Sequence, residues 1–171
     1  PWEGYDRNRR IRLTNRDLEI LEREFPEVEQ VAANTWLSSK KIAYEGEFMD
    51  VSLRGSLPEV ARIEGIKGAR GRFIRDYRKS ALIDEATSLV LFKGADPLGK
   101  FVRVDSLTFK IVGVTQGDAM RNNAVCIIPL STGQLIYNAN EPYVNNAIIT
   151  VRDIRTDAEM EDFEKRLTGR L

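Results

Sequence analysis

A turn followed by a β-hairpin is the strongest structural constraint in this chain, and it occupies residues 96–114. In the turn Asp96-Pro97-Leu98-Gly99-Lys100, proline presets φ, glycine permits a positive φ and aspartate can bond back to the backbone. We expect strands over 101–104 and 107–114, with a tight reversal at Asp105-Ser106. Gly113, inside the second strand, indicates a bulge or a close backbone approach. The stretch holds no histidine, no cysteine and no carboxylate pair facing a nucleophile, so it is typical of a shaped connector and argues against an enzyme.

Helices and strands are interspersed unevenly along the rest of the chain. Thr14 and Asp17 have the pattern of a capping box, which predicts a helix over 15–25 that Pro26 stops. Further helices are expected over 85–93, 132–137 and 156–167, the first packing through Ala86, Leu89, Val90 and Phe92 and stopped by Gly94, the last through Met160, Phe163 and Leu167. Strands are expected over 28–37 and 41–47, joined as a hairpin by Ser38-Ser39-Lys40, and over 49–57, 80–83, 125–128 and 143–151. This order predicts an α+β fold rather than a doubly wound α/β fold.

The segments between these elements carry turn and loop signals. Pro58 predicts a short helical turn with Val60 and Ile63 pointing inward. Glycines at 65, 68 and 71 predict a loop, as does the polar run 117–123, and 138–140 is expected to be a turn.

Composition excludes several classes of function. At 171 residues, with 42% hydrophobic and 30% charged residues, the chain can bury a core as one domain or two small ones. Its 26 basic and 26 acidic residues cancel, whereas nucleic-acid binders usually carry a basic excess, so we expect no nucleic-acid partner. The absence of histidine excludes His-based catalysis and most zinc and iron sites. The single cysteine excludes an internal disulfide and a thiolate metal cage.

The residues that could suggest chemistry have structural explanations. Cys126 lies in an apolar run and is expected to be a small buried hydrophobe. The adjacent acids Asp84-Glu85 and Glu161-Asp162 diverge on a helix and cannot act as an acid/base couple. The arginine-rich runs over 7–12 and 70–79 are typical of solvated faces. We therefore expect no catalytic, cofactor-binding or metal-ligating residues and no cofactor.

Several short motifs, taken in order, carry a family resemblance. They are Leu13-Thr14 with Asp17, Phe25-Pro26 with Val28, Gly71-Arg72-Phe73 with Asp76, Leu91-Phe92 leading into Asp96-Pro97-Leu98-Gly99-Lys100, the strand from Phe109 to Val114, and Ile128-Pro129-Leu130 with Thr132. Over residues 11–171 this order and spacing resembles the extracytoplasmic core domain of MacB-like ABC-transporter permeases, a group that includes FtsX-like and lipoprotein-release permeases.

The resemblance implies a two-lobed extracytoplasmic domain between the first two membrane helices of a permease. It implies a Porter-like lobe from 11–66 plus 125–171, a small α/β lobe inserted as 67–124, and a membrane-proximal N-terminal segment over 1–10. The implied location is the bacterial inner membrane, with this segment periplasmic or extracellular. The implied partners are the permease's own membrane helices, a cytoplasmic ATP-binding subunit and a periplasmic adaptor protein, in a homodimeric or heterodimeric transporter. The chain starts at Pro1 and has no apolar stretch near ~20 residues, so we expect it to be a piece of something longer.

Three functions follow as hypotheses. The first is a non-catalytic relay of ATP-driven conformational change to cargo or a periplasmic partner in efflux or export, with the helix over 156–167 transmitting force. The alternative is an extracytoplasmic ligand-binding sensor module, which a closed apolar cavity with convergent polar groups would favour. A hydrolase is disfavoured because Thr87 and Ser88 have no base to activate them.

Overall fold

The computed structural model describes residues 13–63, 68–72, 79–116, 124–137 and 142–171. In chain order the elements are β1 (Leu13–Thr14), α1 (Asn15–Glu24), β2 (Val28–Tyr44), β3 (Glu47–Ser56), α2 (Glu59–Ile63), β4 (Gly68–Gly71), β5 (Ser80–Asp84), α3 (Glu85–Phe92), β6 (Phe101–Val104), β7 (Leu107–Thr115), β8 (Val125–Pro129), α4 (Leu130–Tyr137), β9 (Tyr143–Val144), β10 (Asn146–Val151) and α5 (Asp157–Arg170). The predicted α+β class is confirmed by this mixture and by the largely antiparallel pairing. Among the described residues, no helix is long and apolar enough to cross a lipid bilayer.

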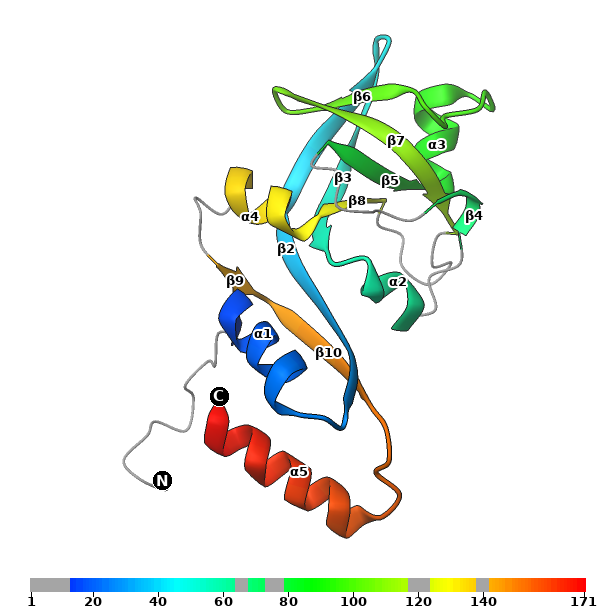
Figure 1. Cartoon of the computed structure of the whole chain (residues 1–171). Helices are drawn as coiled ribbons and strands as arrows, with labels where there is room; N and C mark the ends of the chain where they lie inside the picture. The colour runs from blue at the N-terminus through cyan, green and yellow to red at the C-terminus, as the bar shows by residue number, and fades with distance from the viewer. Residues whose placement is uncertain (1–12, 64–67, 73–78, 117–123, 138–141) are drawn as a thin grey trace.

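Six strands close into a small barrel at one end of the molecule (Figure 1). Strand β2 pairs with β3, β3 with β8, β8 with β5, β5 with β7 and β7 with β6, and β6 returns to β2. A closed barrel leaves few unpaired edges and fills its interior with side chains. The filling includes Ile42, Leu53, Phe109 and Ile128, each at most 1% exposed, and α3 adds Leu91 and Phe92 to the same cluster. We call this cluster the barrel core.

A second core lies at the other end of the molecule and is separate from the first. Its buried members are Leu18, Leu21, Phe25, Val28, Val31, Ala33, Leu130, Val144 and Phe163, supplied by α1, the first half of β2, α4, β9 and α5. Strand β10 pairs antiparallel with the first half of β2 here and extends the sheet. We call this cluster the helical core. The 17-residue β2 supplies buried residues to both cores, Val28, Val31 and Ala33 to the helical core and Ile42 to the barrel core, and it spans about 56 Å at 3.3 Å per residue.

The turn and hairpin that dominate the sequence form as expected. Gly99 has a positive φ of 79°, and Asp96 Oδ1 accepts a hydrogen bond from the Leu98 N–H at 3.1 Å. Strands β6 and β7 pair antiparallel and reverse at Asp105, whose φ is 53°. A Cβ added at Gly113 would lie 2.4 Å from the carbonyl oxygen of Arg72, which confirms the predicted close backbone approach. The capped helices α1 and α5 are also confirmed, both with complete capping boxes.

The predicted hairpin over 28–47 is wrong in its turn. Ser38-Ser39-Lys40 lies inside the continuous β2, where the register with β3 shifts between Trp36 and Ser39. The chain reverses instead at Glu45-Gly46, with φ of 43° and 83°. Two successive residues with positive φ make the turn that best matches the twist of paired strands, so the two-residue Glu-Gly sequence outcompetes three polar residues.

The predicted packing face of the helix over 85–93 is wrong for most of its residues. The buried side chains of α3 are Thr87, Ser88, Leu91 and Phe92, while Ala86, Leu89 and Val90 are exposed. Thr87 and Ser88 are buried in the first turn of the helix, where Oδ1 of Asp84 accepts the Thr87 N–H at 2.9 Å. The helix also ends one residue early, at Lys93 with a left-handed φ of 51°, with Gly94 following at 89°.

Smaller differences concern the loops. The glycine-rich segment predicted as a loop contains β4, which pairs with β7, and the predicted strand over 143–151 is interrupted at Asn145. Val60 is buried as expected. The side chain of Ile63, Gly65, the loop over 117–123 and the turn over 138–140 lie outside the described residues. The assignment of 67–124 to an inserted lobe stays a prediction.

Candidate functional site

Helix α5 packs on the helical core through one fully buried side chain. Phe163 is 2% exposed and contacts Phe25 edge-on, with ring centroids 5.8 Å apart and planes at 81°. Of the predicted stripe, Leu167 is partly buried on the same cluster, whereas Met160 is 36% exposed. The stripe is therefore confirmed for two residues and wrong for the third.

Two arginines near the end of α5 join it to the segment between α1 and β2. Arg166 donates to Oε1 of Glu27 at 2.5 Å and also to Asp162 at 3.0 Å. Arg170 binds both carboxylate oxygens of Glu24, through Nε at 2.5 Å and a second nitrogen at 2.7 Å. These hydrogen bonds lower the pKa of Glu24 and of Glu27 below their ordinary values. Together with Phe163, the ion pairs make α5, α1 and the start of β2 one connected unit, which we call the helix clamp.

Sequence reasoning found Phe163 and Leu167 but missed the ion pairs of the clamp. Arg166 and Arg170 are four residues apart on one helix face, and Glu24, the last residue of α1, is followed three residues later by Glu27 in the connection to β2. That complementary spacing is a signal that could have been noticed.

A polar network lies between the two cores, where β3 runs beside β2. Oδ1 of Asn34 accepts hydrogen bonds from Nε of Arg54 at 2.9 Å and from Oγ of Ser56 at 2.6 Å. All three side chains are buried, and the guanidinium of Arg54 also lies over the Trp36 ring at 4.7 Å. Buried polar groups need partners, and those with good geometry fix strand register. This network therefore pins β2 and β3 together at the crossing between the cores.

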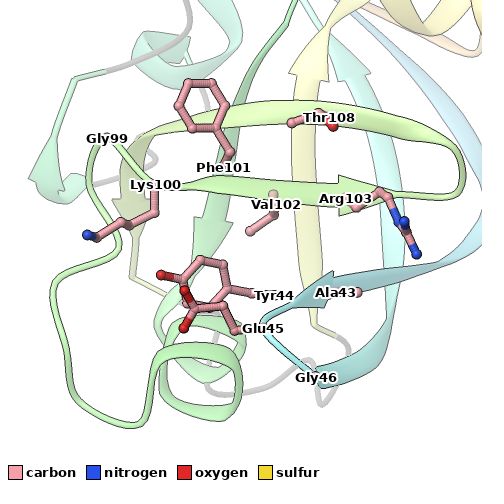
Figure 2. Close-up of a pocket in the computed structure, with 10 residues that line it drawn as sticks. All are labelled: Ala43, Tyr44, Glu45, Gly46, Gly99, Lys100, Phe101, Val102, Arg103 and Thr108. Carbon is pink, nitrogen blue, oxygen red and sulfur yellow. The ribbon is translucent and has the colours of Figure 1, made fainter.

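An open pocket of about 590 Å³ lies at the barrel end, where β6 separates from β2 (Figure 2). One wall is the β2–β3 turn with Tyr44 and Glu45, and the other is β6 with Lys100, Phe101 and Arg103. A second open pocket of about 310 Å³ lies beside it and shares Tyr44, Glu45 and Lys100. We call the first pocket the seam notch.

The residues considered for chemistry have structural roles. Cys126 is fully buried in the barrel core, and burial raises the pKa of its thiol to about 12. Asp84 caps α3 and also accepts the Val125 N–H at 3.2 Å, while its neighbour Glu85 is exposed. Glu161 and Asp162 make separate surface ion pairs with Lys165 and Arg166. Within the described ranges, no three acidic or cysteine side chains gather where a metal ion could bind.

Comparison with known proteins gives one consistent result. The family model described as the MacB-like periplasmic core domain matches residues 1–169. The macrolide export ATP-binding/permease protein MacB of Vibrio parahaemolyticus is 27% identical over 175 residues, which cover 94% of this chain and 26% of that protein. Its counterpart from Azoarcus is 27% identical over 100 residues, covering 55% of this chain and 15% of that protein. The chain thus spans about a quarter or less of these relatives.

Solved structures share the fold. The periplasmic region of MacB from Actinobacillus actinomycetemcomitans matches with a TM-score of 0.76 at 23% identity, covering 95% of this chain and 75% of that one. The extracellular domain of the noncanonic ABC-type transporter YknZ from Gram-positive bacteria matches with a TM-score of 0.71 at 18% identity, covering 88% and 78%.

Proposed function

The chain belongs to the family of MacB-like periplasmic core domains of ABC-transporter permeases, and from this premise we propose that it relays ATP-driven conformational change from the membrane to cargo or to a periplasmic partner. The proposed relay is mechanical, and in it the two cores move together as a rigid body. ATP hydrolysis belongs to a separate cytoplasmic unit, and the membrane helices of the permease connect the two.

One observation carries this proposal: both ends of the described chain belong to the same core. Leu13 and Leu167 both pack on the helical core, whereas the buried members of the barrel core all lie between residues 42 and 128 (Figure 1). A domain inserted between two membrane helices needs its two ends together, with the remainder projecting away. We therefore place the helical core next to the membrane and the barrel at the far end.

The helix clamp gives the relay a physical input. Helix α5 is the last element of the chain, and Phe163 with the two arginine–glutamate pairs ties it to α1 and β2. A displacement of α5 therefore reaches β2 directly, and β2 continues into the barrel core. Packed elements of this kind transmit rigid-body movements rather than deforming continuously.

The two cores suggest a division of the domain into two lobes. We propose that the membrane-proximal lobe is the helical core and that the distal lobe is the barrel, which includes the second half of β2, β3 and β8. These elements supply Ile42, Leu53 and Ile128 to the barrel core. This division places more of the chain in the distal lobe than a boundary at 67 and 124 would.

The two pockets described among the residues of the structure favour a relay over a ligand sensor. A sensor would need an enclosed apolar cavity with convergent polar groups. The seam notch and its neighbour are open, and charged side chains from Glu45, Lys100 and Arg103 line the notch.

The test replaces Phe163 and Leu167 with Ala in the full-length transporter and measures ATP hydrolysis and cargo transport separately. The relay predicts continued hydrolysis with reduced transport, because α5 can move without moving β2. Met160→Ala, on the exposed side of the same helix, is the matched control and should leave both rates unchanged. Normal transport in a folded double variant would show that the clamp does not carry the movement.

A further inference from the structure

The outer surface of the barrel presents two exposed aromatic rings around a small residue. Ala43 of β2 pairs with Phe48 of β3 on one side and with Arg103 of β6 on the other. Directly opposed residues share a sheet face, and Phe101, two residues before Arg103, shares it as well. Phe48 and Phe101 are 62% and 59% exposed. Ala43, Phe101 and Arg103 all line the seam notch, and Phe48 lies beside it as the strand partner of Ala43.

The backbone of β6 also faces the notch. Phe101 pairs with Lys110, whose N–H donates away from β6 to the carbonyl oxygen of Lys79 at 2.7 Å. The pair is therefore non-hydrogen-bonded, so the N–H and C=O of Phe101 point away from β7 and towards β2. Strand β2 pairs with β6 only at Val104 and Arg103, and it does not reach Phe101. A donor and an acceptor of the main chain are thus directed into the notch.

The charges around the notch are unbalanced. Three nearby acids are neutralised within the chain: Glu47 by Lys93 at 2.8 Å, Asp105 by Lys40 at 3.4 Å and Asp96 by Arg70 at 3.6 Å. In the part of the chain that the structure describes, by contrast, no ion pair forms at the four cations of this surface, namely Lys41, Lys100, Arg103 and Lys110. Lys41 lies instead over the Phe48 ring at 4.8 Å. Glu45 and Asp50 are the acids left to offset these four, so the surface keeps an excess of positive charge.

From these three observations we infer that the seam notch binds an extended segment of a partner protein that carries carboxylate side chains between apolar ones. The apolar side chains cover Phe48 and Phe101, the carboxylates pair with Lys100 and Arg103 at the two ends of the β6 segment (Figure 2), and the backbone of the segment bonds to that of Phe101. Exposed aromatic and arginine side chains at the centre of a patch are the usual anchors of protein interfaces. The inference deepens the proposed function. It rests on that function for one point only, namely that the partner is a protein outside the membrane.

Two synthetic peptides test the inference on the 171-residue chain itself. The probes are acetyl-Leu-Glu-Val-Glu-Leu-amide and its lysine analogue, acetyl-Leu-Lys-Val-Lys-Leu-amide, titrated into isotope-labelled protein and followed through backbone amide signals. The acidic peptide should shift the amides of 43–46 and 99–103 and bind at least about tenfold more tightly than the basic one. Raising the salt concentration should narrow that difference.

Charge reversal supplies the decisive comparison. The double substitution Lys100→Glu and Arg103→Glu should invert the order of the two affinities, so that the lysine peptide binds more tightly than the acidic one. Arg16→Glu, an exposed change on α1 far along the chain from the notch, should preserve the original order. Phe101→Ser should weaken both peptides, because it removes apolar contact without changing charge. Amide signals of the unbound variants show whether each is folded.

The inference is overturned if the two peptides bind equally, if the shifts fall outside the notch, or if the order survives charge reversal in a folded variant. None of these results bears on the relay, because the assay contains neither membrane nor ATP. Conversely, a full-length transporter that still couples ATP hydrolysis to transport without the helix clamp would refute the relay. That result would not affect the proposed binding of a segment in the seam notch.

Discussion

Phe163→Ala should release α5 from the rest of the domain without unfolding the barrel. Phe163 is the only fully buried side chain of α5, with 2% exposure, and its ring contacts that of Phe25. Truncating a buried phenylalanine costs about 3–5 kcal/mol, a figure that includes the lost ring contact and the cavity. Because the rest of α5 is largely exposed and can relax, we expect the lower end, about 3 kcal/mol.

Amide hydrogen exchange measures this effect helix by helix. A loss of about 3 kcal/mol corresponds to roughly a 100-fold faster exchange of α5 amides, since each 1.4 kcal/mol is a factor of ten. The amide of Ile111, in the fully buried part of the barrel core, should keep its rate. Met160→Ala is the matched control and should change α5 exchange by no more than about twofold, as an exposed position within about 0.5 kcal/mol.

Two results would refute this reasoning. If Phe163→Ala accelerates α5 exchange less than about threefold, the helix is not held by its one buried ring. If Ile111 accelerates as much as α5, the two cores unfold as one unit, and the clamp is not a separable element.

Three further predictions follow from single groups. The hydrogen bond from Arg170 lowers the pKa of Glu24, so this ion pair should stabilise the docking of α5 fully when the pH is above the ordinary glutamate pKa. This stabilisation should disappear as the pH falls through the lowered pKa. An NMR titration that gives an ordinary pKa for Glu24 would contradict the contact. Burial raises the pKa of Cys126 to about 12, so the thiol should resist alkylation at pH 8 until the chain is denatured, and fast alkylation of the native protein would show that the barrel opens. Gly113→Ala should destabilise the fold by about 2 kcal/mol or more in urea denaturation, since the new Cβ would lie 2.4 Å from a backbone oxygen. Gly169→Ala, whose new Cβ would have no atom within 4 Å, should leave stability unchanged or raise it. Equal urea midpoints for the two variants would contradict the close backbone approach at Gly113.

Local signals in the sequence were sufficient for the hairpin and the capped helices. Turns such as the one ending at Gly99 and caps such as Thr156 with Glu159 depend on residues next to one another, so their physics is present in a short window. The same holds for the burial of Cys126, which follows from its apolar neighbours.

Non-local pairing decided the places where the sequence misled. The 17-residue β2 is about three times the length of a typical strand, and its polar middle resembles a turn until β3 pairs with it at Ser39 and Lys40. In the first turns of α3 the polar residues Thr87 and Ser88 are buried, while the apolar Leu89 and Val90 are exposed. The orientation of this helix is set by its packing on the barrel rather than by its own sequence pattern. The seam notch likewise depends on β2 and β6, which meet only after the barrel closes.

The central claim is that movement reaches the barrel through the helix clamp. The most direct measurement is the number of cargo molecules transported per ATP hydrolysed by the full-length transporter, compared across Met160→Ala, Phe163→Ala and the double variant with Leu167→Ala. The account predicts that this ratio falls in that order, in step with the exchange rate of α5 amides. A ratio that stays constant while α5 becomes progressively undocked would contradict it.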